Sequence, residues 1–575
     1  MVGLVALLVC ALSGAALIAR AARPDPTSTL TLSIVGTTDL HGYFTAREGR
    51  GGIGVFAGYI NNLRAARRVD DGGVVLLDAG DTFQGGVESD LSEGAAVVDA
   101  YNALGYTALA IGNHEFDFGA ADRPGARQHP QDDPQGAVKA RAAQAHFPFL
   151  AANLLDASTG RRVDWPNVHP STLTTIAGVK VGVVGIMTAG ALRATLPLNV
   201  RGLAMAPPAV AVREQAEALR AQGATVVIVS AHAGGYCGAF DNPRDLSSCD
   251  DSAEIFDVAR AMPPGLVDAI VAGHTHAALA HVVNDIPIVQ AWWGGRGFGR
   301  IDLQVDRTTG RVTSSHPIAP VEICARTDGR TGSCAAADVG VTATYEQRPV
   351  VEDAAVLRAM APALARVKAL QDTPLGPVLE APLPRTGDRE SPLGNLFADA
   401  LRERTASDVA MNTASIGGLR TDLPSGPITF GRLYDTFPFD NRLVRLTLTV
   451  DALQQGIANT LRRGRRGAFG ISGVHVQVNC ATDGPRVRVL NLDGTPMDQA
   501  RRLTVAGMDS LFGGQYYAPS ILGPGALAVP PDAPIMREVV EDWLRERGQA
   551  LQAATYLSAE DRRMAVDPQD GCLAQ

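Results

Sequence analysis

Residues 270–276 read Ile270-Val271-Ala272-Gly273-His274-Thr275-His276, so a short apolar run passes through glycine directly into two histidines. An apolar run of this length bounded by glycine is typical of a buried strand. Four more segments, residues 33–41, 74–81, 108–114 and 226–232, likewise run from apolar residues into Asp, Asn or His. Because ligands bind beyond the carboxyl ends of strands in open α/β sheets, we expect all five segments to converge on one crevice.

The polar residues that end these runs have the chemistry of metal ligands. Imidazoles and carboxylates without thiolates suit Zn, Mn or Fe in an open site rather than a closed structural zinc site. Seven such residues exceed the needs of one ion, so we expect two divalent metal ions that share a carboxylate, as in centres that hydrolyse phosphate esters. The predicted ligands are Asp39, His41, Asp81, Asn113, His232, His274 and His276.

Each segment alone has an ordinary structural explanation. Asp39 and His41 can be a solvated loop pair, Asn113 can occupy a left-handed turn, and histidines at strand ends can satisfy backbone groups. The metal interpretation places both members of each closely spaced pair on the same side of an extended segment. The conjunction of five independent segments favours that interpretation.

The order of the motifs, D-x-H, G-D, G-N-H-E-F-D, H and G-H-T-H, resembles the metallophosphoesterase superfamily. Three C-terminal motifs resemble the substrate domain of the bacterial periplasmic 5'-nucleotidase/UDP-sugar hydrolases and the animal ecto-5'-nucleotidases: residues 389–396, 417–420 and 438–441. The resemblance spans the chain from about residue 30 onward. It implies an α/β protein with an N-terminal layered α/β/β/α metallophosphoesterase sandwich, a linker helix and a C-terminal α+β substrate-binding domain.

The length of 575 residues also predicts more than one domain. We expect a catalytic domain over residues 26–345, a linker helix over 346–371 and a substrate domain over 372–575. The helical repeat of apolar residues from Val351 to Leu370 supports the linker. Residues 4–19 form an uncharged apolar run, so residues 1–25 are expected to be a signal peptide or an uncleaved anchor. An exported protein, periplasmic or at the cell surface, follows.

The net charge limits the classes of molecule that the protein is expected to bind, and the cysteines suggest disulfides. The net charge of −9 argues against binding of nucleic acid polymers, and membrane contact is expected only through the N-terminal segment. Anionic substrates stay possible because metal ions and local arginines supply positive charge. Besides Cys10, six cysteines in an exported chain suggest disulfides, and sequence proximity favours Cys237–Cys249 and Cys324–Cys334, which leaves Cys480–Cys572.

The resemblance also implies individual roles in the catalytic domain. Asp39, His41, Asp81 and His276 would hold one ion, while Asp81, Asn113, His232 and His274 would hold the other. His114 would steady the phosphoryl group, and Asp117 would orient and charge its imidazole. Asp117 favours a 5'-nucleotidase over the related 2',3'-cyclic nucleotide phosphodiesterases, which tend to carry Asn there.

In the C-terminal domain the resemblance assigns the phosphate to Arg389 and Arg420 and the base to the aromatic rings of Phe439 and Tyr517. The position at which the family has Asn falls on either Asn412 or Ser415, and Gln515 stands where the family has Asp. The implied reaction is metal-dependent hydrolysis of 5'-nucleotides to nucleosides and phosphate by hydroxide that the ions generate. UDP-sugars, 3'- or 2',3'-cyclic nucleotides, another phosphoester or sulfur ester, and a non-catalytic binding protein stay open as alternatives.

Overall fold

The computed structural model describes residues 28–47, 49–121, 132–336, 339–385, 390–413, 418–463, 469–481, 484–513, 529–530, 533–548, 550–556, 558 and 562–566. Arg389, Ser415, Gln515, Tyr517 and Cys572 lie outside these ranges, as does the N-terminal segment through residue 27. The predictions made for them, including the pairing of Cys480 with Cys572, are therefore outside the described residues.

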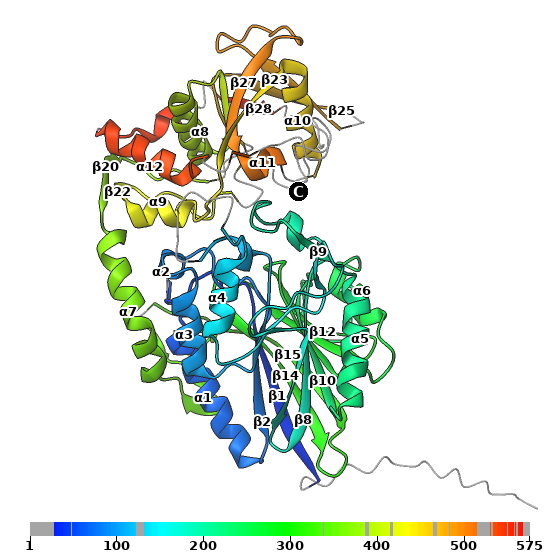
Figure 1. The fold of residues 1–575 in the computed structure, drawn as a ribbon. Coiled ribbons are helices and arrows are strands. Elements are labelled where there is room, and N and C mark those ends of the chain that lie inside the picture. The colour runs from blue at the N-terminus through cyan, green and yellow to red at the C-terminus, as the bar shows by residue number, and fades with distance from the viewer. Residues whose placement is uncertain are drawn as a thin grey trace, which may run out of the picture.

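Two mixed sheets form the centre of the N-terminal half (Figure 1). The seven-stranded sheet has the order β15 (Val312–Glu322), β14 (Gly297–Asp306), β1 (Thr29–Thr37), β2 (Gly73–Asp78), β3 (Ala108–Ala110), β4 (Phe149–Leu150) and β6 (Val168–His169). The six-stranded sheet has the order β12 (Ala278–Val283), β13 (Ile286–Ala291), β11 (Ala269–Ala272), β10 (Val226–His232), β8 (Val179–Met187) and β7 (Ser171–Ile176). In both sheets the central strands run parallel, which brings their carboxyl ends to a common edge.

The two sheets pack face to face around an apolar layer that includes Leu32 and Ile34 of β1 and Ile228 of β10. Gly36 permits this close approach, since a Cβ there would lie 2.2 Å from Cγ1 of Val271 in the other sheet. The outer faces are covered by helices, and separate apolar clusters join them to each sheet. These helices are α1 (Ile53–Val69), α3 (Ala95–Leu104) and α4 (Gly136–Gln144) on one side, and α5 (Pro208–Ala221) and α6 (Glu254–Arg260) on the other. The predicted α/β/β/α sandwich is confirmed.

A long helix, α7 (Ala354–Gln371), connects the two halves (Figure 1). It begins at Ala354, whereas the linker helix was predicted from residue 346 and the apolar repeat starts at Val351; β19 (Arg348–Pro349) lies within the predicted range. The start is set by Asp353, whose carboxylate caps the helix by accepting the N–H groups of Ala355 and Val356. The predicted helix between the two halves is therefore present, with a start set by its cap rather than by its apolar pattern.

The C-terminal half is α+β, with a core of its own. Its sheets have the orders β23-β27-β21-β24, β26-β25-β28 and β20-β22. The strands are β20 (Pro374–Leu379), β21 (Val409–Thr413), β22 (Gly426–Thr429), β23 (Leu443–Thr449), β24 (Phe469–Ser472), β25 (His475–Ala481), β26 (Gly484–Leu490), β27 (Arg502–Met508) and β28 (Met564–Val566). The helices are α8 (Pro392–Thr405), α9 (Phe430–Thr436), α10 (Val450–Arg463), α11 (Asp509–Gly513) and α12 (Met536–Arg547).

Short elements complete the chain: α2 (Val87–Asp90), β5 (Leu154–Asp156), β9 (Leu203–Met205), β16 (Arg326–Thr327), β17 (Val341–Thr342), β18 (Thr344–Tyr345), β19 (Arg348–Pro349) and the 3₁₀ turns η1 (His114–Phe116), η2 (Ala191–Arg193) and η3 (Ala553–Thr555).

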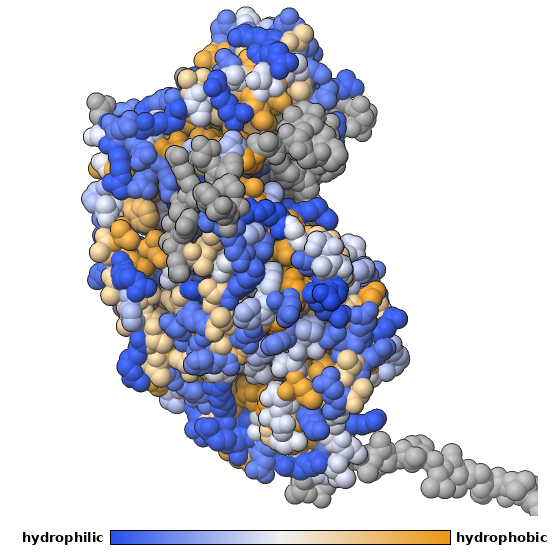
Figure 2. Space-filling model, viewed as in Figure 1, coloured by the Kyte–Doolittle hydropathy of each residue, from blue (hydrophilic) through white to orange (hydrophobic). Residues whose placement is uncertain are grey.

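Two of the predicted disulfides, Cys237–Cys249 and Cys324–Cys334, are confirmed. None of the helices that the structure describes combines the length and apolar character needed to cross a membrane. Figure 2 shows a mostly hydrophilic face on both halves, with apolar residues in small scattered patches.

The two halves meet through α2 and α9 above the edge where the strands end. The Tyr434 hydroxyl donates to Oδ2 of Asp90 at 3.0 Å, and the Gln84 amide donates to the carbonyl of Pro438. Val87, Val367 and Tyr434 form a small apolar cluster at this junction. The C-terminal half therefore closes over the carboxyl edge of the sandwich.

Candidate metal centre

The seven predicted ligands come from the carboxyl ends of five parallel strands. Asp39 and His41 follow β1, Asp81 follows β2, and Asn113 follows β3, all in the seven-stranded sheet. His232 is the last residue of β10, and His274 and His276 follow β11, both in the six-stranded sheet. The facing sheets thus bring all seven residues to one edge.

Within that edge the side chains form two groups. In the first, the donor atoms of Asp39, His41 and His276 lie within 4.8 Å of one another, and the Nε2 atoms of the two histidines are 3.0 Å apart. In the second, those of Asp81, His232 and His274 lie within 4.8 Å of one another. Each group has the size of the ligand shell of one cation.

Asp81 lies between the groups. Its Oδ2 is 3.1 Å from Nε2 of His232 in its own group and 4.0 Å from Nε2 of His41 in the other. The amide oxygen of Asn113 joins the second group at 3.1 Å from Nε2 of His232. The arrangement has the form of two cation sites with one carboxylate between them.

The backbone at five of these residues is left-handed, with φ values of 50° at Asp39 and His41, 55° at Asp81, 78° at His274 and 55° at His276. The expectation that each closely spaced pair projects from an extended segment is therefore wrong. Left-handed non-glycine residues cost about 1–3 kcal/mol each and persist only where the surroundings hold them. Tight turns, rather than extended strands, aim these side chains.

Glycine permits the turn before His274. A Cβ at Gly273 would lie 2.1 Å from Oγ1 of Thr38, and so would clash with the turn that carries Asp39. The N–H of His274 then donates to both carboxylate oxygens of Asp39, at 3.1 and 3.0 Å. The Gly-His-Thr-His motif thus locks the two sheets together at the site.

Backbone carbonyls orient two of the imidazoles. Nδ1–H of His41 donates to the carbonyl of Gln84, and Nδ1–H of His232 donates to that of Ala79, each at 2.8 Å. A ring that donates through Nδ1 keeps the Nε2 lone pair for a metal ion. Both rings therefore present the nitrogen that faces the site.

Glu115 is a residue of the site that sequence reasoning missed. Its carboxylate is fully buried and accepts the N–H groups of Asp81, Thr82 and Gly112, at 2.9, 2.6 and 2.6 Å. Burial, with the charge of Asp81, raises the pKa of Glu115 to about 7. The signal was present in G-N-H-E-F-D, because a buried loop must find acceptors for its N–H groups.

The donor set fits divalent cations. Burial lowers the pKa of His274 to about 4 and that of His276 to about 3, so both imidazoles are neutral, which is the form that binds metals. Burial raises the pKa of Asp39 to about 7, and the neighbouring charge of Asp81 adds to the effect. The two carboxylates, with exposures of only 0% and 2%, call for compensating positive charge. The charge of Asp81 outweighs burial and raises the pKa of His232 to about 10, and bound cations would supply further positive charge.

His114 lies beside the second group, at the start of η1. Its Nδ1–H donates to Oδ2 of Asp117 at 2.6 Å, and Oδ1 of Asp117 accepts the hydroxyl of Thr195 at 2.7 Å. Burial lowers the pKa of His114, but the charges of Asp117 and Asp81 outweigh it, so the pKa is raised overall. The His114 imidazole beside the candidate metal centre therefore keeps its proton to higher pH than an ordinary histidine does.

Two family profiles match the chain: "Calcineurin-like phosphoesterase" over residues 32–278 and "5'-nucleotidase, C-terminal domain" over residues 371–519. The protein UshA of Yersinia enterocolitica is 25% identical over 542 residues, which cover 89% of this chain and 91% of UshA. A 5'-nucleotidase of Vibrio cholerae is 26% identical over 465 residues, or 76% of each chain. The chain belongs to the 5'-nucleotidase family. It is a phosphoester hydrolase with the two-domain architecture of that family.

Solved structures share this fold. A 5'-nucleotidase precursor from Thermus thermophilus superposes with a TM-score of 0.67 at 22% identity, over 94% of this chain and 100% of that one. The sulfate thiohydrolase SoxB of the same genus superposes with a TM-score of 0.63 at 18% identity, over 94% and 97%. The fold is therefore that of 5'-nucleotidases, and SoxB has the same fold.

The C-terminal domain of this 5'-nucleotidase family member brings two predicted substrate residues to the metal centre. The guanidinium of Arg420 lies 4.9 Å above the ring of Phe439, whose centroid is 6.0 Å from that of His114. The positive charge of Arg420 contributes, after burial, to the lowered pKa values of His41 and His276. Asn412 lies on β21, fully buried, and its side-chain amide has no hydrogen-bond partner among the described residues.

Proposed function

We propose that this protein hydrolyses nucleoside 5'-monophosphates to nucleosides and phosphate and depends on two divalent metal ions such as Zn²⁺ or Mn²⁺. The observation that carries the proposal is the paired donor groups with Asp81 between them, faced across the domain junction by Arg420. Two adjacent cation sites with a cationic phosphate ligand opposite are the components of metal-assisted phosphoester hydrolysis.

The seven ligand residues would hold the cations. Asp39, His41, Asp81 and His276 are assigned to one site, and Asp81, Asn113, His232 and His274 to the other. Bound divalent cations supply Lewis acidity, which activates water and polarises a phosphoryl oxygen. His114, whose pKa is raised by the charge of Asp117, would donate from Nε2 to an oxygen of the phosphoryl group.

The C-terminal domain would bind the rest of the nucleotide. The forked guanidinium of Arg420 is suited to two hydrogen bonds with the phosphate, and Phe439 offers a face on which a base can stack. The exposed part of Phe439 is small in this closed arrangement, with an exposure of 9%. We assign Arg389, Asn412, Ser415 and Tyr517 to the same pocket, with residues 372–575 as the substrate domain.

The preference for 5'-nucleotides rests on Asp117 and on the relatives named 5'-nucleotidase. Residues 26–345 form the catalytic domain and residues 346–371 the linker in this proposal. We further propose export to the periplasm or cell surface, directed by residues 1–25. The two disulfides support that location, since disulfides persist in oxidising compartments.

Release of phosphate from 5'-AMP, 3'-AMP, 2',3'-cyclic AMP and a UDP-sugar by the full chain, with Mn²⁺ or with EDTA, tests the proposal. We expect release that EDTA abolishes and that is fastest with 5'-AMP. The Asp81→Asn variant should lose activity and retain fewer metal ions, whereas Asp156→Asn, at the end of β5 where its side chain accepts from the next turn, should behave as wild type.

Two outcomes would overturn parts of the proposal. Metal-dependent activity that favours another ester keeps the metal centre but replaces the substrate class. Full activity in the presence of EDTA, or two bound metal ions without hydrolysis of any ester tested, contradicts the assigned reaction.

A further inference from the structure

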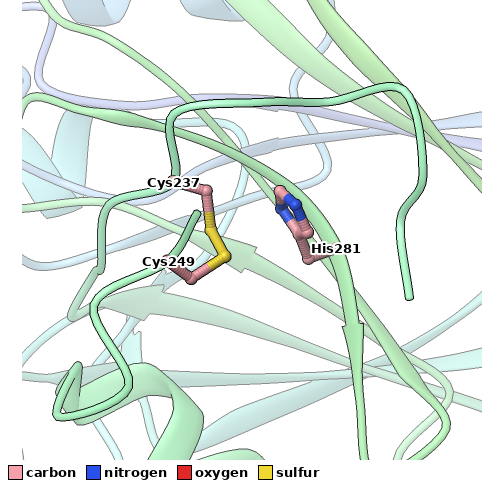
Figure 3. Close-up of side chains that lie close together, drawn as sticks. All are labelled: Cys237, Cys249 and His281. Carbon is pink, nitrogen blue, oxygen red and sulfur yellow. A yellow bond between two sulfur atoms is a disulfide. The ribbon is translucent and has the colours of Figure 1, made fainter. Parts of the chain in front are cut away.

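A second cluster of metal-ligand side chains lies apart from the seven residues described above. The disulfide of Cys237 and Cys249 lies beside His281, which belongs to the edge strand β12 (Figure 3). The two sulfur atoms and a ring nitrogen of His281 lie within 4.8 Å of one another. Two of the three residues, Cys237 and His281, are buried, and Cys249 is half-buried.

The imidazole of His281 makes few hydrogen bonds to the described residues. It has no exposed surface, yet its Nε2 has no hydrogen-bond partner among the described residues. Nδ1 accepts the N–H of the adjacent residue Ala280, at 3.3 Å. Burial lowers the pKa of His281, with partial compensation from the carbonyl of Ala239 and the charge of Asp245, so the ring is neutral. Because Nδ1 accepts, the proton of the neutral ring lies on Nε2, and Nδ1, which makes only this long bond among the described residues, is the nitrogen that a cation would take.

The second disulfide provides a contrast. Glu322 lies near Cys324 and Cys334, but its carboxylate accepts hydrogen bonds from Arg296, at 3.0 and 2.8 Å, and lies 4.0 Å from Arg50. The carboxylate of Glu322 is therefore already paired with two arginines. The cluster at His281 is different because Nε2 of its third member has no hydrogen-bond partner within the described part of the chain.

We propose that reduction of the Cys237–Cys249 disulfide creates a three-ligand site for a thiophilic divalent cation such as Zn²⁺, formed by the two cysteine sulfurs and His281. Two thiolates and one imidazole are a ligand set that zinc accepts, with a fourth position left for water. The catalytic centre contains no sulfur ligand, so a signal that requires metal–sulfur bonds distinguishes the two kinds of site.

The chemistry balances with a dithiol as reductant. The dithiol gives two electrons and two protons to the sulfur–sulfur bond, which breaks to give two cysteine thiols, and the reductant becomes a disulfide. Binding of the cation then forms two metal–sulfur bonds and releases two protons, while His281 binds as the neutral imidazole.

The scaffold allows the required spacing. Tetrahedral zinc with bonds of about 2.3 Å to sulfur needs its two sulfurs about 3.8 Å apart. The Cα atoms of Cys237 and Cys249 are 4.0 Å apart and their residues pair as an antiparallel bridge. Two unlinked cysteine side chains from such neighbours reach this spacing by rotation about their Cα–Cβ bonds.

Titration of the reduced full chain with Co²⁺ tests the proposal. Cobalt bound by thiolates shows sulfur-to-metal charge-transfer absorption, which the oxygen and nitrogen ligands of the catalytic centre cannot produce. We expect this band only after reduction, and we expect it to saturate at one Co²⁺ per chain beyond the ions bound in the catalytic centre. It should disappear in Cys237→Ser and persist in the matched control Cys334→Ser. His281→Gln should lower the affinity for Co²⁺ by at least the roughly 10-fold that loss of even an outer-shell partner costs.

Protection from alkylation gives a second, residue-resolved measurement. Zn²⁺ should slow the modification of Cys237 and Cys249 in the reduced chain and leave the rate at Cys324 and Cys334 unchanged. The absence of the cobalt band, its persistence in Cys237→Ser, or an unchanged affinity in His281→Gln would overturn the proposal. Loss of the folded far-UV signal on reduction would overturn it as well, because the site needs β12 in place.

Discussion

The indole ring of Trp293 lies nearly parallel to the imidazole of His276, with ring centroids 5.3 Å apart and 14° between the planes. The same indole meets the ring of His41 edge-on, at 6.3 Å. Unlike the rings of His41 and His232, the ring of His276 makes no hydrogen bond to a backbone carbonyl within the described part of the chain. The stacked indole of Trp293 therefore restricts the orientation of the His276 ring.

Replacement of this indole should weaken metal binding. We expect Trp293→Ala to reduce the affinity of one of the two metal sites about 10–100-fold, as removal of an orienting partner does. Calorimetric titration with Mn²⁺ measures the effect. Trp292→Ala is the matched control, since that ring lies under Arg296 and not against a predicted ligand. Equal metal affinities in the two variants would contradict the role of Trp293.

The charge of Asp117 should control the alkaline limb of the pH–rate profile. Because Asp117 raises the pKa of His114, the imidazolium persists to higher pH than an ordinary histidine would allow. Asp117→Asn removes that charge, so the pKa falls and the decline in kcat moves to lower pH. Profiles of kcat against pH for wild type and variant test this. Thr195→Ala, which removes a hydrogen bond but no charge, should shift the limb less.

His114 itself should act on the rate and not on metal retention. Removal of one preorganised donor to an oxyanion typically costs about 10²–10³ in kcat. We expect His114→Ala to show a loss of that size with the metal content of wild type. Nε2 of His114 lies 4.0 Å from Oδ2 of Asp81, close enough to belong to the ligand set. A His114→Ala variant that loses its metal ions would therefore make His114 a metal ligand.

Arg420 should contribute to phosphate binding across the domain junction. A hydrogen bond to a charged group is worth about 1.5–3 kcal/mol, so Arg420→Ala should raise the inhibition constant of inorganic phosphate about 10–100-fold. Competition assays with the metal-loaded enzyme measure it. Arg432→Ala is a suitable control, because that side chain donates to the carbonyls of Ser425 and Pro427 instead. An unchanged constant in Arg420→Ala would remove Arg420 from the site.

Asp90 should make the stability of the domain junction depend on pH. Burial raises its pKa well above the ordinary value, while Tyr434 and the N–H of Gly85 donate to its two oxygens. Below the ordinary pKa of about 4 the acid is protonated both folded and unfolded, and its contribution is complete. As pH rises from there to the raised pKa, only the unfolded chain ionises, so stability falls by up to about 1.4 kcal/mol per pH unit.

The Asp90→Asn variant keeps the shape of the neutral acid but has no ionisable group, so it should lack the pH-dependent loss of stability. We expect the Tm of wild type to fall relative to that of Asp90→Asn as pH rises above about 4. Asp71→Asn, whose side chain is 80% exposed, serves as the control. A Tm difference that is independent of pH would show that Asp90 is not protonated in the folded protein.

The sequence predicted the sandwich and the convergence of the seven ligand-type residues because both follow from short apolar segments and the residues that end them. Each residue directly follows an apolar strand, and parallel strands put their carboxyl ends at one edge, so no knowledge of distant contacts was needed. Two disulfides were predicted for the same reason, since their cysteines are only 12 and 10 residues apart.

Only the tertiary structure revealed how those residues are held. Contacts between the two sheets and their loops produce the left-handed turns at Asp39 and His41. They also produce the hydrogen bond from the N–H of Asp81 to the Glu115 carboxylate and the stacking of Trp293 on His276. The bond from Tyr434 to Asp90 joins residues 344 positions apart. The periodicity of a sequence reports which residues share a strand or a helix face. It carries no record of which side chains from separate elements meet, because that is decided by packing of the whole chain.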